Sequence, residues 1–119
     1  MAGLSTPTVA LATKLLEEVG FDDRLIGYRL RERMGAVSAT LYSFAEVVAL
    51  LHDSCPRIDF ARLEAWVRDV QGDRELADRM KECLADASHE REKLLRLRTW
   101  MDERLAQARA LRELGSRVT

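Results

Sequence analysis

The sequence predicts an all-α fold: an antiparallel four-helix bundle with one short N-terminal helix, two long helices over about 23–52 and 74–114, and a middle helix over about 60–71. Two apolar series predict the long helices, because residues that recur at alternating steps of four and three lie on one face of a helix. Pro56 and Gly72 separate the segments. The first series comprises Leu30, Met34, Val37, Leu41, Phe44, Val48 and Leu51, and the second runs from Leu76 to Leu111 with Glu90 and Arg104 as its only interruptions.

Length and composition predict a single globular domain over 1–119, with frayed tails at 1–5 and 115–119. Of the 119 residues, 47% are apolar and 33% are charged, and the formal net charge of -1 gives no overall attraction to nucleic acid. Charged residues interrupt every apolar stretch, so no membrane span is expected. Cys55 and Cys83 form no disulfide framework, which favours the cytoplasm, and the excess of arginine over lysine favours a bacterial source.

The N-terminal segment predicts the short helix. Thr6 and Pro7 form a typical helix start. Threonine can cap the first turn, and an N–H at the position of the proline would have no partner within the helix. Gly20 predicts the end of this helix, as a C-cap in the left-handed conformation.

The second segment predicts a helix that begins after Asp22 and Asp23 and ends near His52. At the start of a helix, these two carboxylates would be stabilised by the positive end of the helix dipole. Gly27 and Gly35 lie inside this helix, where a glycine costs about 1 kcal/mol relative to alanine. We expect the close approach of another helix to account for both glycines.

In the C-terminal half, Asp59 is expected to cap the middle helix, Gly72 to end it, and Asp73 to cap the last helix. An unbroken last helix would be longer than the rest of the chain could cover. It therefore either bends near 86–89, where helix propensity is lowest, or packs its C-terminal half on a second subunit. We favour a homodimer, because large apolar patches mark interfaces. The expected interface residues are Leu94, Leu97, Trp100, Met101, Leu105 and Leu111.

A zinc site can be assembled from His52, Cys55, Cys83 and His89, which are the ligand types of structural zinc centres. The last two are six residues apart, however, and this spacing places them on different sides of a helix. Cys83 also belongs to the second apolar series, where a free cysteine packs as a small apolar side chain. A structural role is therefore favoured for these residues, and no cofactor is expected.

Residues 24–44 support a DNA-binding alternative. The piece VSATLY at 37–42 resembles the recognition helix of TetR-type repressors, which implies a helix-turn-helix with its turn at Gly35. Arg31 stands where that motif has a small residue, and the apolar series passes through Gly35 without a change of phase, which favours one continuous helix. The residues that would contact phosphates are Arg24, Arg29, Arg31 and Arg33.

The sequence contains no recognisable catalytic set, since no nucleophile is linked by spacing to a base and an orienting group, and there is no glycine-rich phosphate loop. We therefore expect a non-enzymatic interaction or regulatory protein that self-associates and presents helical surfaces to a partner protein. A small DNA-binding regulator that uses residues 24–44 is the first alternative. A metal- or cofactor-binding helical bundle is the second.

Overall fold

The chain folds into helices and a three-stranded antiparallel sheet, so the predicted all-α four-helix bundle is wrong. The computed structural model describes the backbone of residues 3–118 and the side chains of residues 3–114. The elements in chain order are α1 (Val9–Leu16), the 3-10 turn η1 (Phe21–Asp23), β1 (Leu25–Arg31), β2 (Gly35–Leu41), α2 (Phe44–Leu51), β3 (Pro56–Arg57), α3 (Phe60–Ala65), the π-helical turn η2 (Trp66–Val70), α4 (Arg74–Asp86) and α5 (Glu90–Val118).

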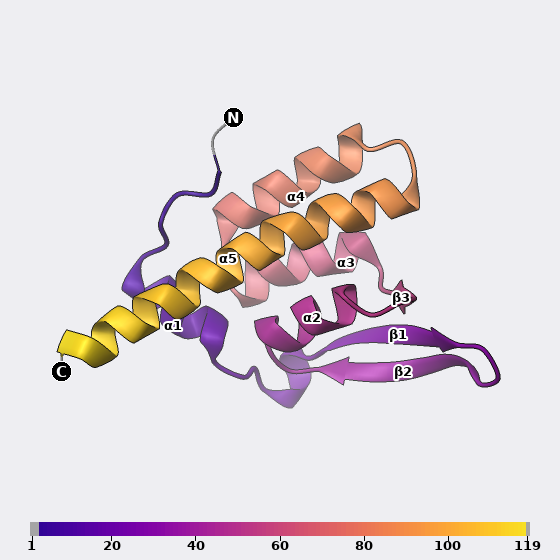
Figure 1. Ribbon diagram of the computed structural model, residues 1–119, viewed down its shortest axis with the longest axis horizontal. Coiled ribbons are helices and arrows are strands. Elements are labelled where there is room, and N and C mark those ends of the chain that lie inside the picture. The colour runs from indigo at the N-terminus through magenta and orange to yellow at the C-terminus, as the bar shows by residue number, and fades with distance from the viewer. Residues whose placement is uncertain (1–2, 119) are drawn as a thin grey trace.

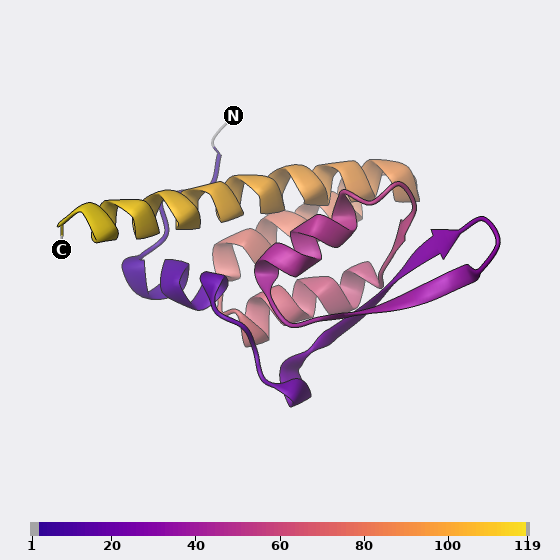
Figure 2. The same cartoon turned by 60° about the horizontal axis from the view of Figure 1, so that its bottom comes forward.

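Helix α5 spans the molecule, and α1, α2 and α4 pack against it (Figure 1). Its C-terminal half contacts α1, and its N-terminal half runs antiparallel to α4. The sheet lies on the side away from α5, and the hairpin of β1 and β2 extends beyond the helices at its turn (Figure 2). The fully buried side chains that form the centre of the core include Leu15, Phe44, Leu50, Leu63, Leu76, Met80, Leu97 and Met101.

Most of the helix predicted over 23–52 is the β1–β2 hairpin. In β1, Leu25 and Gly27 are buried while Ile26 and Tyr28 are exposed, which is the two-residue alternation of a strand with one covered face. The apolar series was misleading because residues four apart, such as those at 37 and 41, lie on the same side of a strand as well as of a helix. Only its last part, in α2, is helical.

The two glycines of this region serve the hairpin and not a helix. Gly35 follows the turn at 32–34 and has a φ of 69°, a left-handed conformation that glycine adopts without steric cost. Gly27 allows the sheet to approach α2, because a Cβ on Gly27 would overlap the end of the Leu50 side chain and lie 3.3 Å from the Arg57 carbonyl oxygen. The predicted close approach therefore occurs at Gly27, but between strand and helix.

Helix α2 begins at a local capping arrangement. The Ser43 side chain accepts a hydrogen bond from the Glu46 N–H, and the Glu46 carboxylate accepts one from the Tyr42 N–H. This reciprocal pattern satisfies N–H groups that have no partner within the helix. It fixes the start of α2 directly after β2.

The middle helix agrees with its prediction, since α3 and η2 together cover 60–70. Asp59 caps α3 by accepting from the N–H groups of Ala61 and Arg62, and Asp73 caps α4 by accepting from the Leu76 N–H, so both predicted caps are confirmed. Gly72 lies between these helices with a φ of 73°.

The cap predictions for the N-terminal helix were wrong at both ends. The N-cap of α1 is Thr8 and not Thr6, because the Thr8 hydroxyl accepts from the Leu11 N–H. At the other end the helix stops at Leu16, and Gly20 has an extended backbone with a φ of -72°. Asp22 and Asp23, predicted to cap a long helix, form the η1 turn.

The predicted single helix over 74–114 is also wrong, because the chain reverses direction between Asp86 and Glu90. His89 Nδ1 accepts from the Glu92 N–H, and the Glu92 carboxylate accepts from the Ser88 N–H. These bonds start a new helix in place of continuing the old one. The low-propensity stretch at 86–89 is thus a turn between two antiparallel helices.

A buried guanidinium joins the N-terminal segment to this helix pair. Arg104 on α5 is 1% exposed, and its Nε lies 2.8 Å from an Asp73 oxygen. Its Nη2 donates to Glu75 at 2.7 Å, and its Nη1 donates to the Ser5 carbonyl oxygen at 2.8 Å. Gln107, one turn further on, donates to the Leu4 carbonyl oxygen at 2.9 Å. The N-terminal segment, the start of α4 and the middle of α5 therefore meet at one polar cluster.

Replacing Gly27 with alanine tests the packing of the sheet on α2. Because Leu50 is fully buried and cannot move aside freely, we expect Gly27→Ala to lower the free energy of unfolding by about 1–3 kcal/mol. Gly20→Ala is the matched control, since a Cβ there meets nothing within 4 Å. Urea denaturation of both variants measures the difference, and equal stability would show that the sheet does not press on α2.

Acid titration tests the Arg104 cluster. Hydrogen bonds from Ser5 and then from Arg104 hold the pKa of Glu75 at about 2, below its ordinary 4.5. Because the folded-state pKa is lowered, the ionised carboxylate stabilises the protein above pH 4.5, and this contribution is lost as the pH falls to 2.

Glu75→Gln is therefore expected to lower the free energy of unfolding by about 1 kcal/mol at pH 7, since the carboxylate is partly exposed. In denaturation experiments, the difference in the free energy of unfolding between Glu75→Gln and the wild type should shrink steadily as the pH falls below 4.5. Glu113→Gln, on an exposed part of α5, is the control. A difference between Glu75→Gln and the wild type that is independent of pH would contradict the assignment.

Candidate interaction groove

An open groove of about 1030 Å³ runs between α4 and α5. Helix α4 contributes its exposed side, and α5 contributes the residues of its first three turns. The residues that line it are Arg79, Glu82, Cys83, Ala85, Asp86, Glu92, Leu95, Arg96, Thr99 and Trp100.

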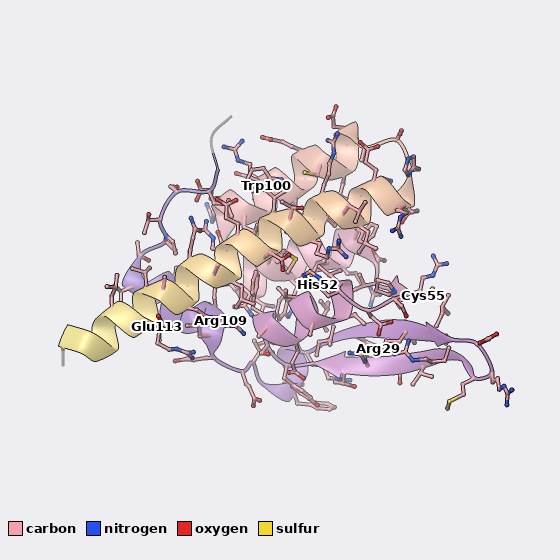
Figure 3. The ribbon with its side chains drawn as sticks, in the orientation of Figure 1. Arg29, His52, Cys55, Trp100, Arg109 and Glu113 are labelled. Carbon is pink, nitrogen blue, oxygen red and sulfur yellow. The ribbon has the colours of Figure 1, made fainter. Side chains whose placement is uncertain are left out.

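The apolar part of the groove is formed by Trp100, Cys83 and Leu95. Trp100 lies on α5 beside α4 (Figure 3), and its indole N–H donates to the Cys83 sulfur at 3.2 Å. Leu95 is 37% exposed and lines the groove together with the half-buried Trp100. The groove therefore offers water-exposed apolar surface that ends in a packed aromatic ring.

Charged groups surround this apolar surface. Arg96 bridges the two helices near their turn, with contacts of 3.0 Å to Asp86 and 2.8 Å to Glu92. The hydrogen bond to Asp86 raises the pKa of the Arg96 guanidinium above its ordinary value. Further along, the Arg79 guanidinium lies 5.7 Å from the Trp100 ring centre, within the range of a cation–π contact.

The apolar residues predicted to form a dimer interface on the last helix are mostly covered within the chain. Leu97 and Met101 are fully buried and Leu105 is 6% exposed, because α4 and α1 pack against this side of α5. Leu94 and Leu111 are half-buried against the core, and Trp100 lies in the groove. Within the described residues, the large apolar side chains that α5 leaves exposed are Leu95 and Leu114, and of these Leu95 lies in the groove beside Trp100.

The four residues considered as zinc ligands lie in two separate places. His52, at the end of α2, has its Nε2 2.8 Å from an Asp102 oxygen on α5, and Cys55 precedes β3 (Figure 3). Cys83 lies in the groove and His89 caps α5. Among residues 3–114, no three His, Cys, Asp or Glu side chains gather in a way that could hold a metal ion.

The helix-turn-helix implied for residues 24–44 is replaced by the hairpin, and the first five residues of VSATLY lie in β2. Two of the four arginines predicted to contact phosphates pair with a carboxylate within the chain. Arg31 forms a two-pronged contact with Asp53 at 2.9 and 3.0 Å, and Arg29 lies 3.5 Å from the same carboxylate. This pairing, together with the Cys55 N–H, holds the pKa of Asp53 at about 2.

The remaining two arginines lie at opposite ends of the hairpin. Arg24, just before β1, lies over the Phe21 ring with 3.7 Å to its centre. Arg33 lies in the exposed turn between the strands. The four side chains therefore form no common face on a helix.

Sequence reasoning named a bend near 86–89 as one of two outcomes, and the structure has its turn there, but the preference for a continuous helix in a dimer hid the groove. Arg79, Cys83, Leu95 and Arg96 are brought together only when α4 and α5 pair antiparallel. A serine at 88 followed by a glutamate at 92, after a stretch of low helix propensity, was the signal that could have revealed the turn.

Comparison with known proteins adds no relationship to these observations. In the described part of the chain, none of the helices is long and apolar enough to cross a membrane. No protein-family model, no curated protein and no solved structure matches this chain.

Proposed function

We propose that this chain is a non-enzymatic interaction protein that binds an amphipathic helix of a partner protein in the α4–α5 groove. The observation that supports the proposal is the exposed apolar surface formed by Leu95 and Trp100 between two antiparallel helices. Two paired helices present a furrow in which a third helix can lie, as in the recurrent helix-in-groove mode of recognition.

The chemistry of the groove favours a peptide over a small polar molecule. Its centre consists of an aromatic ring, a thiol and aliphatic groups, and aromatic anchors of this kind dominate binding energies at protein interfaces. The charged groups lie at its margin, where they stay in contact with water and select an orientation without a large desolvation cost.

The charges also indicate what the bound helix should look like. Glu82 and Asp86 project from α4 with side-chain exposures of 69% and 77%, so the α4 margin is acidic. The α5 margin carries a cation, Arg96, and this guanidinium already pairs with Asp86 and Glu92. A helix with apolar residues at steps of three and four and basic residues along the side that faces α4 fits this pattern.

Photo-crosslinking in cells that contain the protein tests the proposal. A photoreactive amino acid in place of Thr99, inside the groove, should capture one partner protein at a segment with helical apolar spacing. The same substitution at Ala106, which is exposed on α5 outside the groove, is the matched control and should capture little. Equal capture at both positions, or capture of nucleic acid, would refute the proposal.

A peptide that spans the captured segment then allows a quantitative test. We expect Leu95→Glu to weaken its binding at least tenfold, since this places a carboxylate against apolar surface, while the free energy of unfolding changes by less than about 0.5 kcal/mol at this exposed site. Trp100 fluorescence reports binding directly. Unchanged affinity in Leu95→Glu would show that the peptide lies elsewhere.

A further inference from the structure

Strand β2 is an edge of the sheet, because the strand order is β2-β1-β3 and, in the described residues, β2 pairs with β1 alone. An edge strand presents a row of backbone N–H and C=O groups to any other extended chain. Proteins usually protect such edges with charged residues or proline, yet β2 has the sequence GAVSATL. Its outward side chains Ala36, Ser38 and Thr40 are exposed and small, so another strand can approach closely.

The hairpin turn is the basic end of this edge. Arg31, Glu32 and Arg33 lie at or beside the turn and are exposed. Arg29 and Arg31 share the single carboxylate of Asp53. The charges of these residues therefore sum to a net positive value at the turn.

The other end of β2 is acidic. Directly after β2, the Tyr42 carbonyl oxygen accepts from the Val19 N–H at 2.6 Å, which brings residues 17–19 beside the strand end. Glu17 and Glu18 are exposed there, and Asp22 and Asp23 are exposed in the η1 turn that leads into β1. Two cations lie near these four carboxylates in sequence, the exposed Lys14 and Arg24, which lies over the Phe21 ring, so the net charge of this end is negative.

We propose that β2 pairs antiparallel with β2 of a second copy of this chain, about a two-fold axis at Ser38, to form a continuous six-stranded sheet. Antiparallel pairing places the basic turn of each copy against the acidic strand end of the other, so the charge attraction occurs twice. An isologous contact requires a surface that is complementary to itself, and an uncharged strand with opposite charges at its ends has this property. The interface uses a surface different from the α4–α5 groove and does not depend on the function proposed for it.

The register about Ser38 makes the proposal specific. The two copies of Ser38 lie directly opposite each other, where Cα atoms in antiparallel strands are about 4.5–5.5 Å apart. Ala36 of one copy lies opposite Thr40 of the other, so the two copies of Ala36 are four residues apart along the strands. At about 3.4 Å per residue this separation exceeds the reach of a disulfide.

Cysteine crosslinking tests this register. In full-length protein with a Cys55→Ser background, Ser38→Cys should form a disulfide-linked dimer under mild oxidation. Ala36→Cys, equally exposed and on the same side of the strand, should stay monomeric on a non-reducing gel. Equal crosslinking of both variants, or none of Ser38→Cys, would overturn the proposed pairing.

Sedimentation equilibrium from micromolar to millimolar concentration tests the interface without crosslinking. Ser38→Lys places two like charges on the axis and should raise the dimer dissociation constant at least tenfold, whereas Ala106→Lys on the exposed side of α5 should not. Arg33→Glu should also weaken the dimer, and adding Glu17→Arg with Glu18→Arg should restore it.

Circular dichroism of each variant confirms that the hairpin and helices remain folded. A wild-type protein that is monomeric at every concentration would refute the proposal, as would a dimer that Ser38→Lys leaves unchanged. Loss of groove binding in Leu95→Glu with an intact dimer would separate this interface from the function proposed for the groove.

Discussion

The ion pair between Arg104 and Asp73 determines how the N-terminal segment, α4 and the middle of α5 meet. Both side chains are 1% exposed, and charges so far from water are costly unless other polar groups surround them. The cluster meets this requirement with groups from three segments: Ser5 near the N-terminus, Glu75 in α4 and Gln107 in α5. Removing one partner would leave a buried charge without compensation, so the cluster forces these segments into one arrangement.

That arrangement sets the register of α4 against α5 and thereby shapes the groove. Asp73 caps α4 and pairs with Arg104, so the start of α4 is fixed along α5. Further toward the turn, Cys83 contacts Trp100. At the turn itself, Arg96 reaches Asp86. Contacts at three levels hold the helices as a rigid pair, and a rigid pair loses little conformational entropy when a third helix binds.

The sequence predicted features whose physics is local and failed on those that depend on distant contacts. Asp59 and Asp73 cap helices through N–H groups two or three residues away, so their pattern is readable in a short window. The hairpin was missed because even spacings fit both a strand and a helix, and Gly35, interpreted as a packing site, was in fact the signal for its turn. Arg104 was visible only as an interruption of an apolar series, since its partners other than Gln107 lie 29 to 99 residues away.

The candidate groove could not be predicted from the sequence, because its residues meet only through the pairing of α4 with α5. The free edge of β2 could have been recognised once the hairpin was known. Helix α5 and the sheet lie on different sides of the molecule (Figure 2), with α2 and α3 between them. Pairing along β2 would therefore leave the groove of each copy open to solvent. Two grooves held at a fixed separation can bind two helices of one assembly, and the second contact then forms at a high effective concentration. In the proposed dimer, weak binding at each groove would still give firm association with such an assembly, and this would be a physical reason for an edge strand without protective charges.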